Sequence, residues 1–139
     1  MAAHYWLMKS EPDTFSWQML VEKGSTGWDG VRNYQAANNM KAMKLGERGF
    51  FYHSVDEKRI VGIVEVVGLY RPDPSDETGR FGMVEVKAVT PVKRPVTLAE
   101  IKAEPRLQNL LLVRHSRLSV VPIGDAEWKL LCTMAGVRP

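Results

Sequence analysis

The sequence has few of the residues that stabilise proteins through covalent or metal bonds. Its 139 residues include one cysteine, Cys132, and three histidines, His4, His53 and His115. A single thiol excludes an internal disulfide and a cysteine-based zinc cluster, and the histidines lie too far apart in sequence to indicate a metal site. We therefore expect a domain stabilised by ordinary packing, with no metal ion and no cofactor.

Long apolar segments are also missing. No apolar run approaches the ~20 residues needed to cross a bilayer. The first residues do not show the basic stretch and apolar core that are typical of a signal peptide. We expect a cytoplasmic monomer with no membrane partner.

Motifs of the common enzyme classes are absent as well. The sequence contains no phosphate-binding loop, no dinucleotide glycine fingerprint, no nucleophile elbow and no histidine-rich metal motif. Cys132 directly follows Leu131 in a predicted helix, where a packed thiol is the usual role of a cysteine. The sequence thus predicts a protein that is not an enzyme.

What is present is the composition of one globular domain covering residues 1–139. Hydrophobic residues make up 45% of the chain and charged residues 25%, which is typical of a folded domain. Strand-like patterns occupy residues 5–9, 49–54, 60–67, 83–89, 110–113 and 118–121, with loops at 25–32 and 71–79. Helical patterns occupy a segment that ends at Gly24, with Asp13, Thr14 or Ser16 as its alternative caps, and residues 34–45, 97–105 and 125–136, with Asp125 as the expected cap of the last one. Because regular strand–helix alternation is missing, we expect an α+β fold, a small mixed β-barrel with short peripheral helices.

The net charge of +3 is small, but its distribution is uneven. The span 87–117 carries seven basic residues, Lys87, Lys93, Arg94, Lys102, Arg106, Arg114 and Arg117, against Glu100 and Glu104. Such a surplus attracts a polyanion, although a solvated basic surface is an equally good interpretation.

Two polar clusters lie beside aromatic residues. The first, at 9–12, follows a strand that contains Trp6, and the second, at 28–38, is a loop that enters a helix. Asn and Gln amides pair with base edges, and Trp or Tyr rings stack on base faces, so these clusters are suited to binding a flat polar ring. The alternative is local architecture, with Asn33 as a helix cap, Asp29 in a turn, and Trp28 in the core.

Several separated motifs resemble the EVE domain family. They comprise residues 6–12 with 15–16, then 28–36 with Asn38, and then 51–54, 62–66, 72–73 and 117–123. The similarity covers essentially the whole chain. It implies a PUA-like fold related to the YTH and ASCH domains, with a pocket for a modified base in DNA, above all a modified cytosine, or for a modified RNA nucleotide.

The same resemblance implies a set of nucleotide-binding residues. One wall of the pocket would consist of Lys9, Ser10 and Glu11, with Trp28 stacking on the base or closing the pocket. A second group would consist of Arg32, Asn33, Tyr34, Gln35 and Asn38, and a third of His53, Ser54 and Ser119. Structural roles are the alternative for several of them: Arg32 bridging to Glu11 or Asp29, Glu11 pairing with Lys9, and His53 as a satisfied strand histidine.

Three functions follow from such a pocket. The first is a non-enzymatic reader that flips a modified nucleotide out of the stack and holds the flanking backbone with Lys and Arg. The second is an enzyme acting on a nucleobase, with Glu11 or His53 as acid or base. The third is a sensor of small nucleotides.

Overall fold

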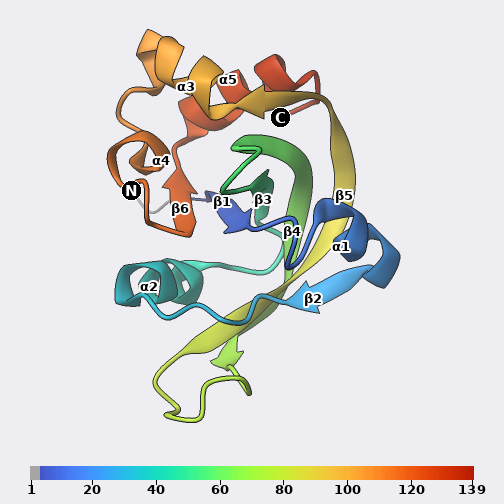
Figure 1. Cartoon of the computed structure of the whole chain (residues 1–139), viewed down its shortest axis with the longest axis vertical. Coiled ribbons are helices and arrows are strands. Elements are labelled where there is room, and N and C mark those ends of the chain that lie inside the picture. Colours follow the sequence, from blue (N-terminus) through green and yellow to red (C-terminus); the bar gives the residue numbers. More distant parts are fainter. Residues whose placement is uncertain (1–3) are drawn as a thin grey trace.

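The computed structural model describes residues 4–139, which form six strands and six helices (Figure 1). The strands are β1 (Tyr5–Ser10), β2 (Ser25–Gly27), β3 (Arg48–His53), β4 (Arg59–Pro72), β5 (Gly82–Thr97) and β6 (Val120–Ile123). The helices are α1 (Trp17–Lys23), α2 (Tyr34–Ala42), α3 (Leu98–Ala103), the 3-10 helix η1 (Pro105–Leu107), α4 (Leu111–Arg114) and α5 (Asp125–Ala135). Within residues 4–139, every helix is too short or too polar to cross a membrane. The expected α+β class is confirmed.

All six strands belong to one mixed sheet in the order β2-β5-β4-β3-β1-β6. β1 runs parallel to β3, and the other neighbouring pairs are antiparallel. Among the described residues, β2 and β6 form the two edges of the sheet, so it is not a closed barrel.

The two longest strands give the sheet its barrel-like curvature. The β4–β5 ladder shifts register at four places between Ile60 and Arg71. Such irregularities bend a strand and increase its twist. Figure 1 shows β4 and β5 curving around the centre of the molecule.

Aromatic stacking fixes α5 on the sheet. Trp128 of α5 is 1% exposed. Its ring lies 4.4 Å from that of Tyr5 on β1 and 4.2 Å from that of Phe50 on β3. Burying a large aromatic side chain of this kind contributes on the order of 2–3 kcal/mol of hydrophobic stabilisation.

Short-range signals predicted most helix ends correctly. Ser16 caps α1 by accepting a hydrogen bond from Met19 N at 3.1 Å. Thr97 and Glu100 form the capping box of α3. Gly24 and Gly136 have positive φ values of 88° and 72°, as expected of glycines that end helices.

Four expectations about the elements were wrong. The helix expected over 34–45 ends at Ala42. Residues 110–113 were expected to be extended, but α4 begins at Leu111, because a short apolar run has the same pattern in a strand and a buried helix. The expected loop 25–32 contains β2, which pairs with β5 at the sheet edge. Gly124, rather than Asp125, is the cap residue of α5, and Asp125 lies in its first turn.

Candidate functional site

A cleft of about 320 Å³ opens where β1 ends, next to α1 and β2. We call it the Trp28 cleft. Its lining combines both polar clusters of the sequence and consists of Lys9, Ser10, Thr14, Phe15, Lys23, Thr26, Gly27, Trp28 and Asp29. Three predicted site residues, Lys9, Ser10 and Trp28, therefore lie together.

Trp28 belongs both to the cleft and to the core. Its side chain is only 7% exposed, and its ring packs edge-on against Phe51 at 5.5 Å. The Trp28 N–H donates to the carbonyl oxygen of Val84 on β5 at 2.7 Å, which fixes the backbone at this point. Core packing and a place in the cleft, treated as alternatives above, are thus combined in one side chain.

Lys9 and Ser10 are held by backbone contacts. The Lys9 ammonium donates to the carbonyl oxygen of Ser116 at 2.8 Å and lies 5.9 Å from the centre of the Tyr52 ring. Burial lowers the pKa of Lys9. The Ser10 hydroxyl donates to the carbonyl oxygen of Phe15, which ties the turn before α1 to the end of β1.

Several lining residues were not among the predicted site residues. Asp29 is exposed at the rim, and its carboxylate makes no hydrogen bond or ion pair with residues 4–139. Lys23 donates to the Thr26 hydroxyl at 3.2 Å. Asp29 lies in the motif that drew attention to Trp28, so adjacency in sequence was the available signal, whereas Thr14 and Phe15 enter the cleft through the fold of the turn.

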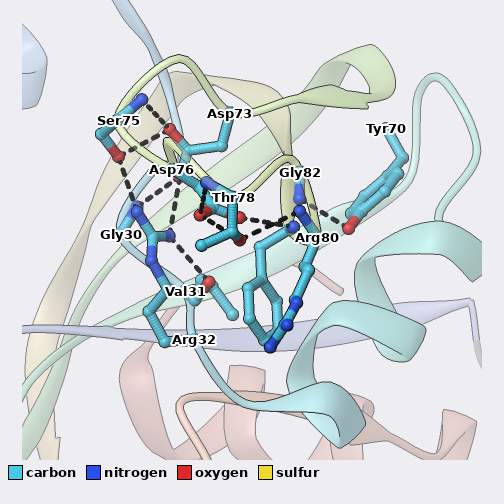
Figure 2. A network of polar contacts seen from close by, with 11 residues as sticks. Gly30, Val31, Arg32, Tyr70, Asp73, Ser75, Asp76, Thr78, Arg80 and Gly82 are labelled. Atoms are coloured by element: carbon cyan, nitrogen blue, oxygen red, sulfur yellow. Dashed lines mark hydrogen bonds and ion pairs between the residues drawn. The ribbon is translucent and has the colours of Figure 1, made fainter.

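Arg32 is a structural clamp. Its Nη1 donates to Asp73 Oδ2 at 3.1 Å, and its Nη2 donates to Ser75 Oγ at 3.1 Å. Figure 2 shows the guanidinium reaching the loop between β4 and β5. The expected bridge to Glu11 or Asp29 was therefore wrong, because Asp73 lies 41 residues away in sequence and the hairpin loop carries it to Arg32.

Asp73 joins this loop to the segment that carries Trp28. Its side chain is buried and accepts hydrogen bonds from Gly30 N at 2.9 Å and from Ser75 N at 2.8 Å, besides Arg32 (Figure 2). Burial opposes ionisation of Asp73, but the hydrogen bonds from Ser75, Gly30 and Arg32 outweigh it and lower the pKa to about 2. Asp73 is thus a permanent anion at neutral pH.

Asn33 and Gln35 line a second cleft, of about 310 Å³, with Arg114, His115, Ser116, Arg117 and Leu118. We call it the Arg117 cleft. Asn33 Oδ1 accepts from Ala36 N at 2.9 Å, which confirms Asn33 as the cap of α2. Tyr34 is 62% exposed and packs on Phe81 at 4.9 Å, and Asn38 is exposed on α2; neither lines one of these two clefts.

His53 has the role of a satisfied strand histidine. Its Nε2 accepts from Trp17 N at 3.0 Å, and its Nδ1 lies 2.9 Å from Glu57 Oε1. These partners define a neutral ring that carries its proton on Nδ1. The hydrogen bond from His53 lowers the pKa of Glu57.

The last predicted residues act through their backbones. Ser54 N donates to Ser10 O, and Lys9 N donates to Ser119 O, each at 2.9 Å. Glu11 is exposed and lies outside both clefts. Lys9 does not form the expected pair with Glu11, because its ammonium group contacts Ser116 instead. Residues 4–139 contain no cluster of three or more His, Cys, Asp or Glu side chains placed to hold a metal ion.

The sequence model of the EVE domain family matches residues 4–134, nearly the whole chain. The chain belongs to the EVE domain family. This EVE domain is 34% identical to human thymocyte nuclear protein 1 over 169 residues, covering 97% of this chain and 75% of the human protein. The family predicted from the separated motifs is confirmed.

Solved structures of relatives share the fold of this EVE domain. A protein of Rhodopseudomonas palustris, solved by NMR, is 51% identical with a TM-score of 0.90, covering 97% of this chain and 94% of its own. A crystal structure from Agrobacterium tumefaciens is 46% identical with a TM-score of 0.92, covering 96% and 93%. Human thymocyte nuclear protein 1 in complex with DNA containing 5-methylcytosine is 36% identical with a TM-score of 0.88, covering 97% and 99%.

A more distant neighbour confirms the broader fold class. The ASCH protein of Zymomonas mobilis is 12% identical, with a TM-score of 0.60 and coverage of 94% of this chain and 95% of its own. At that identity the likeness concerns the fold alone. The expected PUA-like architecture is thus confirmed, in the form of an open, strongly curved sheet.

Proposed function

We propose that this EVE domain is a non-enzymatic module that binds DNA carrying a modified cytosine and holds the modified base in the Trp28 cleft. The observation that carries the proposal is the human relative crystallised with DNA containing 5-methylcytosine, which is 36% identical to this chain. The cleft volume of about 320 Å³ lies at the small end of the ~300–1,000 Å³ range of ligand pockets, which suits one base.

The lining of the Trp28 cleft supports a cytosine derivative. Trp28 and Phe15 offer apolar surface for a ring face and a methyl group. Asp29 offers a free carboxylate, and carboxylates accept hydrogen bonds from the exocyclic amine of cytosine. Flipping a base out of the stack costs a few kcal/mol, which aromatic contact and hydrogen bonds to the base edge offset.

The surroundings of the two candidate acid–base groups favour binding over catalysis. Both ring nitrogens of His53 are engaged by Trp17 and Glu57, and Glu11 lies outside the cleft. General acid–base catalysis requires a group within hydrogen-bond reach of the substrate. Neither residue meets this requirement for a base held beside Trp28.

The proposal is tested by measuring the affinity of the domain for four ligands. They are a DNA duplex with one 5-methylcytosine, the same duplex unmodified, an RNA of the same sequence with 5-methylcytidine, and free 5-methyldeoxycytidine. Burying one methyl group contributes on the order of 1 kcal/mol, so we expect about five-fold tighter binding of the methylated duplex than of the unmodified one.

Each other result points to a different function. Equal affinity for the two duplexes contradicts recognition of a modified base. Tighter binding of the RNA assigns the domain to modified RNA, and equally tight binding of the free nucleoside assigns it to small-molecule sensing. Conversion of the base, detected by mass spectrometry after incubation, would make the domain an enzyme.

A further inference from the structure

The Arg117 cleft is lined by hydrogen-bond donors and by no acidic residue among those the structure describes. Asn33 Oδ1 is occupied by its capping bond, so its amide NH₂ is the group left to contact a ligand. Arg114 donates through Nε to Gln108 O at 3.2 Å and through Nη2 to Asn109 Oδ1 at 3.1 Å. These two bonds orient the guanidinium and leave its Nη1 available.

The ion pairs within residues 4–139 show which cations of the basic span 87–117 have an acidic partner. Lys87, Arg94 and Arg106 each face a glutamate, at 3.8, 3.5 and 2.7 Å respectively. Among the described residues, Lys93, Lys102, Arg114 and Arg117 form no ion pair, and of these four Arg114 and Arg117 line the cleft. Two unpaired guanidinium groups of the basic span therefore lie together in a cleft where other hydrogen-bond donors also converge.

Lys9 connects the Arg117 cleft to the Trp28 cleft. Its side chain lines the Trp28 cleft, and its ammonium donates to the carbonyl oxygen of Ser116, which lines the Arg117 cleft. The Lys9–Ser116 hydrogen bond thus links the linings of the two clefts. When a base occupies the first cleft, its own sugar–phosphate backbone must pass nearby, because the backbone remains attached to the flipped nucleotide.

We infer that the Arg117 cleft binds a backbone phosphate of the DNA strand whose modified base occupies the Trp28 cleft. This inference rests on the proposed function and adds a second contact to it. A phosphodiester carries a full negative charge and acceptor oxygens, which match the guanidinium and amide donors of the cleft. Such a contact strengthens binding equally for every base sequence, because phosphates carry no sequence information.

The inference is tested with Arg117→Gln, Arg114→Gln/Arg117→Gln and a control that removes the same charge elsewhere. Lys129→Gln/Arg138→Gln is that control, since both residues are exposed and outside the cleft, and the C-terminus lies well apart from α2 in Figure 1. Affinity for the methylated and the unmodified duplex is measured over a salt series. Asn33→Asp is a further variant, which keeps the capping oxygen and adds a negative charge to the cleft.

We expect the Arg114/Arg117 double variant to bind both duplexes about ten-fold more weakly. The slope of log K against log salt concentration should become smaller in magnitude by roughly 1–2. The preference for the methylated duplex should stay unchanged, and the control should keep the original slope. Asn33→Asp should weaken binding without loss of thermal stability. Unchanged affinity and slope in the double variant, or a loss confined to the methylated duplex, would overturn the inference.

Failure of the inference is distinguishable from failure of the proposed function. If the protein without substitutions binds both duplexes equally, the proposed recognition of a modified base is wrong. A reduced slope of log K against log salt concentration in the double variant would still support the phosphate contact. If it binds no DNA, both are wrong. Inorganic phosphate serves as a separate probe. If phosphate binding depends on Arg117 but DNA affinity does not, the cleft is a site for free anions and the inference is overturned.

Discussion

Trp28 combines packing with a place in the candidate site, so its substitution should have two consequences. Trp28→Ala removes a side chain that is 7% exposed and packs on Phe51. We expect a loss of about 3–5 kcal/mol of unfolding free energy, the usual cost of Trp→Ala in a core. Binding of methylated DNA by the folded fraction should also weaken, by ~1–3 kcal/mol. Denaturant unfolding and titration of the same sample measure the two effects.

Trp128→Ala is the matched control for that experiment. Trp128 is 1% exposed and packs between Tyr5 and Phe50, outside the Trp28 cleft. The Trp128→Ala variant should lose a comparable amount of unfolding free energy, while its folded fraction keeps normal affinity for methylated DNA. Normal affinity in the folded fraction of Trp28→Ala as well would remove Trp28 from the binding site.

Asp29 is expected to affect binding without affecting stability. Asp29→Asn replaces a carboxylate that makes no contact with the described residues, so the unfolding free energy should change by less than ~0.5 kcal/mol. Loss of a charged hydrogen bond to the cytosine amine should weaken binding by about 1.5–3 kcal/mol. Asp56→Asn, an exposed residue in the β3–β4 turn, is the control, and equal affinities for the two variants would contradict a role for Asp29.

How far single residues were predictable depends on the range of their interactions. Asn33 was predictable as a cap, because the helix that it caps follows directly in sequence. His53 contacts Glu57 four residues away, a spacing visible in the sequence, but its second partner, Trp17, comes from α1. Arg32 was assigned the wrong partners because Asp73 is near it only in the folded chain.

The loop between β4 and β5 acts as a brace for the segment between β2 and α2. Asp73→Asn should lower the unfolding free energy by about 2–3 kcal/mol at pH 7, since it weakens the bond to Arg32 and turns an acceptor toward the Gly30 N–H into a donor. Weaker binding of methylated DNA should accompany this loss, because Gly30 and Arg32 lie two and four residues after Trp28 in the same segment.

The pH dependence of this effect has a defined direction. Because folding lowers the pKa of Asp73 to about 2 from its ordinary value of 3.8, the ionised group stabilises the protein fully above pH ~4. That contribution is lost as the pH falls toward 2. The difference in unfolding free energy between the protein and its Asp73→Asn variant should therefore shrink over this range. Urea unfolding at pH 7, 5, 4 and 3 measures it, and a difference that stays constant down to pH 3 or below would contradict the ionised brace.

At the scale of elements, long periodic patterns and helices with a clear cap residue were predicted correctly, whereas short segments without such a signal were not. The strands β3, β4 and β5 and the helix α5 were predicted from aromatic, β-branched or amphipathic patterns. β2 has three residues and was missed, because its strand character comes from pairing with β5 at the sheet edge. The sequence of β4 was interpreted as a nearly unbroken β-branched run, so its register shifts were missed, although Gly62 and Gly68 lie at three of the four shifts and a glycine inside a strand often marks such a site.

For the whole molecule, the motifs of the sequence predicted the family, but their arrangement in space required the fold. Lys9, Ser10 and Trp28 lie in one cleft, whereas Asn33 and Gln35 lie in a second cleft that the sequence did not distinguish from the first. The net charge of +3 is too small to mark a nucleic-acid surface by itself. Only the ion pairs of the folded chain reveal which cations of the basic span are free.

The central claim, that a modified cytosine binds beside Trp28, is tested most directly by NMR. The four tryptophans give separate indole N–H signals, and the Trp6 indole, bonded to Glu47 at 3.0 Å, and the buried Trp128 indole serve as internal references. On titration with the 5-methylcytosine duplex, the Trp28 signal should shift strongly and differently from its response to the unmodified duplex, while those of Trp6 and Trp128 stay in place. Binding of the methylated duplex with an unmoved Trp28 signal would contradict the claim.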